Sequence, residues 1–463
     1  MEVIRTFDKN YWSLYFDFLE VFKGFNDIPV GLLCHFYGLV KGDPFINKYL
    51  KSESFTEISI CQLQDAEQIQ KYFESFLQPF KSTKPRSNRG KKVIFHDKLL
   101  RFPETSWRKF DPEHTLIIKN RTKLRNNNDK IPIQSLTDYK MDTSKLVKYY
   151  KKKTIKALQM NKDHPIFAHD EFKNRLMKQI PDVVESMSAA RALFDKIPAS
   201  CIILGSTNLP ESRALAIASL EMGVPSICMQ HGIIALEFGY MPKVADVQAV
   251  YGEFEVDWYK QRGVREEELK IIGHPRFDDI RKGNKLSLKQ FIKKTNIDKT
   301  KKSVLLVGHH EETAVTRTII HELSKNGDVN LIIKPRGSPK ETKILKKRYP
   351  NLYVPPHDLH LYDLLRHVDA VVSYPSTVAL EALLAGKTVF IWGIKTESTT
   401  EYFGAMDHLL DHNPLALTNK VCSYLKSTHS SLSDQSELLK AYYPEPDQSS
   451  TGRLIRLINT LTT

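Results

Sequence analysis

The sequence has no long uninterrupted apolar run and no closely paired cysteines. In a chain of 463 residues, no apolar stretch approaches the roughly 20 residues that a membrane-spanning helix needs. The N-terminal stretch MEVIRTFDKNYWSLYF carries an acid at position 2 and lacks a continuous apolar core, so we expect no signal peptide. Five scattered cysteines without a CxxC pair argue against a disulfide framework or a zinc site, and they favour a cytoplasmic protein.

The composition suits folded domains and is strongly basic. Hydrophobic residues make up 41% of the chain and aromatic residues 10%, which is enough to build sizeable cores. The length favours two domains. The net charge of +14 and the pI near 9.2 fit three kinds of partner: nucleic acid, an anionic membrane surface or a phosphorylated substrate.

Three basic clusters lie in the first third of the chain. They are residues 81–92, residues 119–130, and the helical stretch KLVKYYKKKTIK that begins at Lys145. Tyr149 and Tyr150 in the third cluster are suited to stacking on nucleic-acid bases. However, no helix-turn-helix, zinc-finger or RNP motif accompanies the clusters. They therefore favour a solvated face, or peripheral contact with anionic lipid or lipid-linked phosphate at the inner face of the membrane, over nucleic acid.

From about residue 170 the sequence alternates between short apolar runs and amphipathic helices. This alternation predicts parallel strands joined by crossover helices, and hence doubly wound α/β domains. A lysine-rich stretch, 279–302, interrupts the alternation, which restarts at residue 303. The predicted strands cover residues 201–204, 226–229, 247–251, 270–272, 303–307, 329–333, 352–354, 370–372 and 388–392.

The stretch 369–393, DAVVSYPSTVALEALLAGKTVFIWG, reads as strand, polar turn, short helix and second strand. A helix N-terminus has unpaired N–H groups and a positive dipole, so it binds anions. The hydroxyls of Ser373, Ser376 and Thr377 would add donors for a phosphate at this end. Glu381 lies on the same helical face as Thr377, past the capping-box position, and suits a contact with ribose hydroxyls. Ordinary helix capping is the alternative interpretation of the serines and the threonine.

Most polar residues that suggest chemistry directly follow predicted strands. In parallel sheets, ligands bind beyond the carboxyl ends of the strands. A cation after one strand and a hydroxylated helix N-terminus after another make a phosphate site. A histidine after a strand of the first domain is placed to accept a proton from an acceptor hydroxyl, although each histidine taken alone also fits a structural role. The residues at strand ends are His231, His309, His310, Lys334, Arg336, Ser373, Ser376 and Thr377.

Four motifs together resemble a known group of enzymes. They are QHG at 230–232, GHPRFD at 273–278, IIKPR at 332–336 and SYPSTVALEALLAG at 373–386. Their combination is similar to the GT-B glycosyltransferases of capsule and surface-polysaccharide synthesis. It also resembles the related CDP-glycerol glycerophosphotransferases of teichoic-acid synthesis and the spore-coat polysaccharide transferases. The resemblance covers roughly residues 200–395.

The resemblance implies a GT-B fold, in which two Rossmann-like doubly wound domains face a cleft. Its parts would be an acceptor-side domain with basic insertions (1–278), a linker (279–302), a nucleotide-donor domain (303–430) and a helical tail (431–463). The implied reaction moves a sugar or glycerophosphate from a CMP-, CDP- or UDP-linked donor to a surface-polysaccharide or lipid-linked acceptor. It would need no cofactor and no metal, in agreement with the absence of an Asp-x-Asp pair.

The resemblance also implies roles for individual residues. His231 of the QHG motif would be the catalytic base, while Gln230, Gly232 and His274 would lie at the cleft or hinge. Many relatives have Lys-x-His-Pro after the second-domain strand, whereas this chain has Lys334-Pro335-Arg336, so an arginine would replace the histidine as a permanently charged donor. The expected donor-site residues are Lys334, Arg336, Ser373, Ser376, Thr377, Glu381, His309 and His310.

Two other functions remain open at this point. A nucleotide-sugar epimerase or hydrolase of the same fold would use the same nucleotide clamp without an acceptor, although the sequence lacks the carboxylate cluster that we expect for deprotonation at a sugar carbon. A basic nucleic-acid-binding or scaffold protein with an α/β core is an alternative from a different class. Binding of a nucleotide separates the enzymes from the scaffold.

Overall fold

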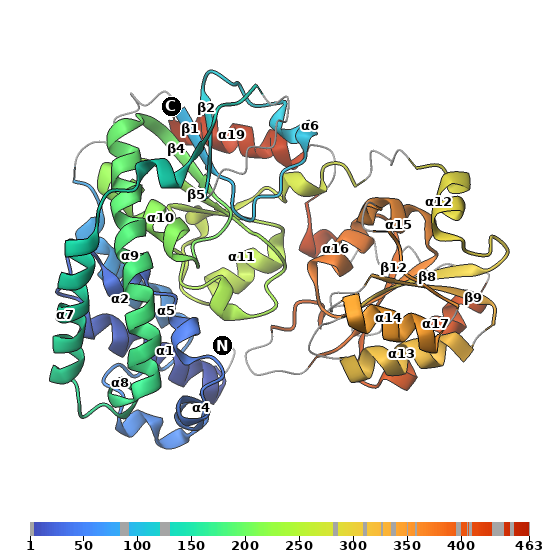
Figure 1. The fold of residues 1–463 in the computed structure, drawn as a ribbon, viewed down its shortest axis with the longest axis horizontal. Helices are drawn as coiled ribbons and strands as arrows, with labels where there is room; N and C mark the ends of the chain where they lie inside the picture. Colours follow the sequence, from blue (N-terminus) through green and yellow to red (C-terminus); the bar gives the residue numbers. More distant parts are fainter. Residues whose placement is uncertain are drawn as a thin grey trace. The chain divides into compact units, whose positions relative to one another are not determined.

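The computed structural model divides the chain into two compact units (Figure 1). Unit 1 comprises Met1–His231, Leu236–Arg276 and Pro446–Thr463, and unit 2 comprises Gly232–Ala235 and Phe277–Glu445. The structure describes residues 4–83, 92–120, 130–280, 286–308, 313–325, 327–334, 339–349, 351–356, 359–394, 400–404, 406, 410–427, 439–444 and 449–462.

Unit 1 is built on a seven-stranded parallel sheet with the order β3-β2-β1-β4-β5-β6-β7. The strand sequence runs outward in one direction from β1 and in the other from β4, so the topology switches between these two strands. Strands such as β5, with the sequence SICM, are buried along their whole length, because helices cover both faces of a parallel sheet. The strands are β1 (Lys92–His96), β2 (Thr115–Lys119), β3 (Ile133–Ser135), β4 (Ala199–Leu204), β5 (Ser226–Met229), β6 (Val247–Val250) and β7 (Leu269–Ile271).

Helices precede, cover and follow this sheet. The aromatic side chains of the first helix, among them Tyr11, Tyr15 and Phe18, are buried core residues. The helix before β5 begins with Pro210 at its first position and ends at Gly223, whose φ of 66° is left-handed. The helices of unit 1 are α1 (Thr6–Val21), α2 (Val30–Leu33), α3 (Phe36–Val40), α4 (Pro44–Leu50), α5 (Gln68–Leu77), α6 (Glu104–Trp107), α7 (Ser144–Met160), α8 (Pro165–Ala168), α9 (Asp170–Lys196), α10 (Pro210–Met222), α11 (Glu253–Lys260) and α19 (Ser450–Thr462).

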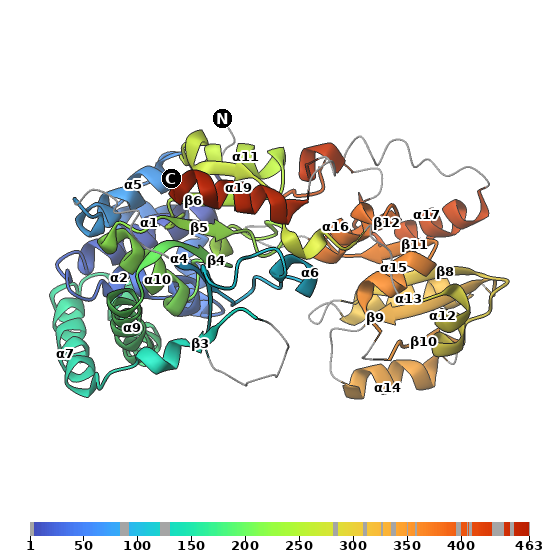
Figure 2. The same cartoon turned by 90° about the horizontal axis from the view of Figure 1, so that it is seen from above.

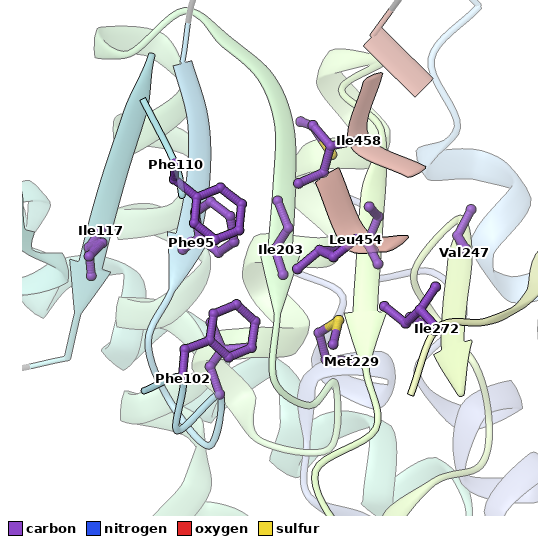
Figure 3. Close-up of a cluster of buried hydrophobic side chains, with 14 of the residues drawn as sticks. Phe95, Phe102, Phe110, Ile117, Ile203, Met229, Val247, Ile272, Leu454 and Ile458 are labelled. Carbon is purple, nitrogen blue, oxygen red and sulfur yellow. The ribbon is translucent and has the colours of Figure 1, made fainter. Parts of the chain in front are cut away.

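A helix from the end of the chain completes the core of unit 1. Leu454 and Ile458 of α19 are buried against Ile203 and Met229 of the sheet (Figure 3). The hydroxyl of Thr451 donates to that of Ser106 at 2.9 Å, which fixes the start of α19 beside α6. Of the expected helical tail, the part that forms α19 is therefore a core element of unit 1.

Unit 2 contains a six-stranded parallel sheet with the order β10-β9-β8-β11-β12-β13. Here the topology switches between β8 and β11. The strands are β8 (Lys302–Val307), β9 (Val329–Lys334), β10 (Leu352–Tyr353), β11 (Ala370–Ser373), β12 (Thr388–Trp392) and β13 (Leu410–Asp411). The helices are α12 (Leu288–Thr295), α13 (Thr313–Lys325), α14 (Pro339–Arg348), α15 (Leu361–His367), α16 (Thr377–Leu384) and α17 (Pro414–Lys426).

Two parallel sheets amid helices confirm the predicted α/β class. Each strand predicted from residue 201 onward is present, with ends that agree within two residues. The sheet of unit 1 additionally contains β1, β2 and β3, which were not predicted. Within the stretch expected to be a linker, residues 288–295 form α12. In the part of the chain that the structure describes, no helix combines the length and apolarity needed to cross a bilayer.

Leu454→Ala should lower the free energy of unfolding of unit 1 by about 2–5 kcal/mol, because this fully buried side chain fills the interface between α19 and the sheet. Urea unfolding followed by intrinsic fluorescence measures the change. Thr460→Ala, on the exposed side of the same helix, should shift the value by less than about 0.5 kcal/mol. Equal midpoints for Leu454→Ala and the wild type would contradict the role of α19 in this core.

Candidate functional site

The carboxyl edge of the unit 2 sheet brings together two of the predicted donor-site residues. Lys334 is the last residue of β9 and Ser373 is the last residue of β11. Because β8 pairs with both strands, these residues flank the end of β8 at the switch point of the sheet. Ligands of open α/β sheets bind at such a point.

Lys334 is half-buried, and its carbonyl accepts a hydrogen bond from the N–H of Gly308 at 3.3 Å. This bond continues the β8–β9 ladder to the edge and holds the lysine backbone in place. Arg336, His309 and His310, which were also predicted to bind the donor, lie outside the described residues.

The N-terminus of α16 follows β11 directly. Ser376 is the N-cap residue, with extended backbone angles, and its hydroxyl accepts a hydrogen bond from the N–H of Ala379 at 3.4 Å. Ser373 donates to the carbonyl of Tyr374 at 2.9 Å, and its oxygen lies 3.0 Å from that of Ser376. The two buried serines thus shape the turn and cap the helix, so the capping interpretation accounts for their contacts. A helix N-terminus favours an anion, so the start of α16 stays the predicted position of a donor phosphate.

Thr377 supports a different segment of unit 2. Its hydroxyl oxygen accepts a hydrogen bond from the N–H of Ile233 at 3.2 Å. Ile233 belongs to the short segment Gly232–Ala235, which is part of unit 2. In the same segment, the carbonyl of Ala235 accepts from the N–H of Thr400 at 3.1 Å. Gly232 of the QHG motif therefore begins a segment that contacts the N-terminus of α16.

Glu381 lies on the second turn of α16 and is only 5% exposed. The hydroxyl of Tyr362, on α15, donates to its carboxylate at 3.2 Å. A buried carboxylate is costly unless hydrogen bonds compensate for its lost hydration. The tyrosine thus stabilises and orients Glu381. Sequence reasoning did not identify Tyr362, because no spacing links a residue of one helix to the face of another.

His231 is placed at the carboxyl edge of the unit 1 sheet, two residues after β5. Its ring stacks on that of Tyr240, with centroids 4.7 Å apart and an angle of 7° between the planes. The guanidinium of Arg276 donates to the backbone carbonyl of His231 at 3.5 Å. Arg276 stands in the GHPRFD motif, whereas Tyr240 has no signal in the sequence.

The surroundings of His231 disfavour its protonated form. Burial, followed by the positive charges of Arg101 and Arg276, lowers the pKa of His231 to about 4. Arg101 lies in the turn after β1 and has a left-handed φ of 53°, as does Leu99 in the same turn, with a φ of 70°. Non-glycine residues in this conformation are uncommon and cluster at functional sites. At neutral pH His231 is therefore a neutral imidazole, able to accept a proton.

The other two motif residues of unit 1 are buried. The amide of Gln230 donates to Glu255 at 2.8 Å and accepts from the N–H of Tyr251 at 3.1 Å, so it clamps the turn between β6 and α11. His274 is completely buried and accepts at Nδ1 from the N–H of Arg276 at 3.1 Å. Burial, with smaller effects from nearby positive charges, lowers the pKa of His274 well below its usual value. Both residues thus support the loops that carry His231 and Arg276.

Among the described residues, no group of three or more His, Cys, Asp or Glu side chains is arranged to hold a metal ion. An apolar pocket of unit 1 is lined by Phe22, Phe25, Phe76 and Phe80, with Lys23 as its charged group. It lies among the N-terminal helices, so we assign it no part in the chemistry.

Comparison with known proteins supports the sequence resemblance in one segment. A sequence model of the family described as capsule polysaccharide biosynthesis protein matches residues 328–396. The match includes β9 with Lys334, β11 and all of α16. It does not include the QHG and GHPRFD motifs. No curated protein matches the sequence.

Solved structures resemble most of the chain. A protein of Listeria monocytogenes, described as a UDP-N-acetylglucosamine 2-epimerase, aligns with a TM-score of 0.52 and 12% identity over 80% of this chain and 96% of that chain. UDP-GlcNAc 2-epimerase from Neisseria meningitidis, solved with UDP-GlcNAc bound, aligns with a TM-score of 0.50 and 11% identity over 80% of this chain and 98% of that chain. The fold is GT-B. At these identities the likeness establishes the GT-B fold alone.

The wall teichoic acid polymerase TagF aligns with a TM-score of 0.47 and 12% identity over 85% of this chain and 93% of that chain. The predicted resemblance is confirmed for the fold by the two epimerase structures, and for residues 328–396 of unit 2 by the family model. The roles of individual site residues stay predictions.

The pKa of His231 predicts a characteristic titration. Its C2 proton resonance should titrate far below pH 6.5, and Arg101→Gln should move the midpoint upward because one positive charge is removed. Between pH 6.5 and about 4, the unfolded chain binds a proton that folded His231 does not, so this residue stabilises the fold above pH 6.5 and the effect is lost as the pH falls towards 4. NMR of the histidine-labelled protein measures the midpoint.

Arg108→Gln is the matched control for this titration. Arg108 lies on the same β1–β2 connection but pairs with Glu104 and is not among the charges that shift His231. Its substitution should leave the midpoint unchanged. A His231 midpoint near 6.5 in the wild type would contradict the described environment.

Proposed function

We propose that this protein transfers a sugar or glycerophosphate from a nucleotide-activated donor to a surface-polysaccharide or lipid-linked acceptor, without a metal ion. One observation carries the proposal. Lys334 and the N-terminus of α16 lie on either side of the switch point of the unit 2 sheet, inside the segment that matches the capsule polysaccharide family. A cation and a helix N-terminus at such a point suit the phosphates of a nucleotide.

Unit 2 binds the donor in this proposal. The ammonium of Lys334 and the N–H groups at the start of α16 neutralise the donor phosphates, together with Arg336, His309 and His310. Glu381, held by Tyr362, accepts hydrogen bonds from the ribose hydroxyls. The same positive groups stabilise the nucleotide as it leaves with its negative charge, which removes the need for a divalent ion.

Unit 1 supplies the base. Neutral His231 accepts the proton of the acceptor hydroxyl while the hydroxyl oxygen forms the new bond to the transferred group. The bond between that group and the nucleotide phosphate breaks at the same time, and the electron pair leaves with the nucleotide. The low pKa of His231 keeps it in the form that can take a proton across the physiological pH range.

The acceptor side of the proposal involves the cell envelope. Surface polysaccharides that grow on lipid carriers would bring the protein to the cytoplasmic face of a membrane. The basic clusters of unit 1 suit such a location, because positive charge attracts anionic lipid headgroups.

Nucleotide binding is the first test. CMP, CDP, UDP and GDP are added separately and the thermal unfolding of the full chain is followed. One of them should stabilise the protein, by about 2.7 kcal/mol at a hundred times its dissociation constant. If no nucleotide shifts the transition and the protein binds RNA in a salt-sensitive way, the scaffold function replaces the transferase.

The roles of the two units predict opposite effects of two substitutions. His231→Ala should abolish transfer while leaving nucleotide binding intact, and Glu381→Ala should weaken nucleotide binding, by about 1.5–3 kcal/mol for a lost charged hydrogen bond. Transfer assays and titration calorimetry measure the two effects. His114→Ala, an exposed histidine of unit 1, serves as the control and should change neither.

Near-normal turnover of His231→Ala would refute its assignment as the base. Conversion of a nucleotide sugar in the absence of any acceptor would identify a same-fold epimerase or hydrolase instead. Tyr362→Phe should reproduce part of the Glu381→Ala effect, since it removes the hydrogen bond that orients the carboxylate.

A further inference from the structure

Helix α7 is held firmly on unit 1 by one of its faces. Tyr150, Thr154 and Leu158, spaced four residues apart, are its buried positions. The hydroxyl of Tyr150 accepts a hydrogen bond from the N–H of Ile28 at 3.2 Å. The ammonium of Lys153 donates to the carbonyl of Gly24 at 3.3 Å. Figures 1 and 2 show α7 at the periphery of unit 1, alongside α9 and remote from the sheet.

The opposite face of α7 carries positive charge only. The helix has 17 residues, contains no Asp or Glu, and has six lysines. A helix of this length extends about 25 Å, and an uncompensated row of like charges along it repels itself. Four of the lysines are exposed on the outer side: Lys145, Lys148, Lys152 and Lys156.

Large apolar side chains are also exposed on α7, along the two flanks of this lysine row. A single exposed apolar residue is ordinary, but several on one short helix mark an interaction surface. They are Leu146 (43% exposed), Tyr149 (56%), Ile155 (45%) and Met160 (77%). We call these four residues and the four exposed lysines the outer face of α7.

From this outer face we infer that α7 lies flat on an anionic membrane surface. Lysines attract anionic headgroups, and exposed apolar side chains insert at the boundary between headgroups and acyl chains. Both features occur along one rigid helix of a protein without a membrane-spanning helix among its described residues. Nucleic acid is the other polyanion of a cell, but aliphatic side chains such as Ile155 and Met160 gain nothing from it, because its recognition relies on charge and aromatic stacking.

This inference deepens the proposed function, since it supplies the contact that would bring the protein to a lipid-linked acceptor. It is nevertheless tested separately. Vesicle binding requires no nucleotide and no turnover. A failure of the membrane contact can therefore be distinguished from a failure of the proposed transferase function.

The test is sedimentation of the full chain with lipid vesicles. Wild-type protein should bind vesicles of phosphatidylcholine mixed with phosphatidylglycerol far more tightly than vesicles of phosphatidylcholine alone. The triple variant Lys145→Gln, Lys152→Gln and Lys156→Gln should bind the anionic vesicles on the order of 100-fold more weakly. The substituted side chains are exposed, so circular dichroism should show an unchanged fold.

Helix α14 provides a matched control for net charge. The triple variant Lys343→Gln, Lys346→Gln and Lys347→Gln removes the same charge from exposed positions of unit 2 and should bind vesicles like the wild type. An equal loss in both triple variants would show attraction by net charge alone and would overturn the assignment of α7.

The apolar part of the outer face has its own variant. Tyr149→Ser with Met160→Ser should reduce the vesicle binding that persists at high salt, because screening weakens the lysine contribution but leaves insertion intact. The proposal is overturned if this variant binds vesicles at high salt as well as the wild type does. It is also overturned if the wild-type protein does not bind anionic vesicles, or if a single-stranded RNA oligonucleotide displaces the protein from these vesicles.

Discussion

Parallel pairing of strands is the constraint on which the proposed chemistry depends. It places the carboxyl ends of all strands of a sheet at one edge, and a reversal of the strand order opens a position there for a ligand. In unit 2 the reversal falls between β8 and β11, so Lys334 from one side and α16 from the other reach the same edge, although Thr377, the first residue of α16, lies 43 positions after Lys334 in the sequence. The topology of the sheet, and no local motif by itself, brings together the parts of the proposed phosphate site.

Several side chains of the candidate site form hydrogen bonds to one another or to the surrounding turns. Ser373 and Ser376 bond to each other and to the turn, and the carboxylate of Glu381 is held by Tyr362. Gln230 clamps the turn after β6. Such contacts fix side chains before a ligand arrives, which lowers the entropic cost of binding it. The residues predicted to bind the ligand therefore form two groups. Some lie at the carboxyl edge of a sheet, and others form hydrogen bonds that stabilise the turns at that edge.

The sequence predicted the fold best where strands and helices alternate at short intervals. Strands β5 and β12 were predicted with their observed ends, because each is an apolar run bounded by polar residues and glycine. Strands β1 to β3 escaped prediction because long connections separate them, which removes the alternation on which the inference relied. The packing of α19 on the sheet of unit 1 was not predicted either. Helical periodicity shows that one face of a helix is buried, but it does not show which element covers that face. Tyr240 and Arg101 were missed at the site for the same reason: stacking and charge proximity are tertiary.

The surroundings of His231 distinguish this proposed base from the usual histidine–carboxylate pair. A carboxylate partner raises the pKa of an imidazole, whereas burial, followed by the charges of Arg101 and Arg276, lowers the pKa of His231. A weak base of this kind can take the proton of an acceptor hydroxyl only while the new bond forms. Positive charge beside the acceptor oxygen favours the negative charge that develops on it during this step. The same arginines favour an acceptor that is itself anionic. An acceptor carried on a lipid phosphate would supply the negative charge near these arginines, and its membrane would supply the anionic surface for the outer face of α7.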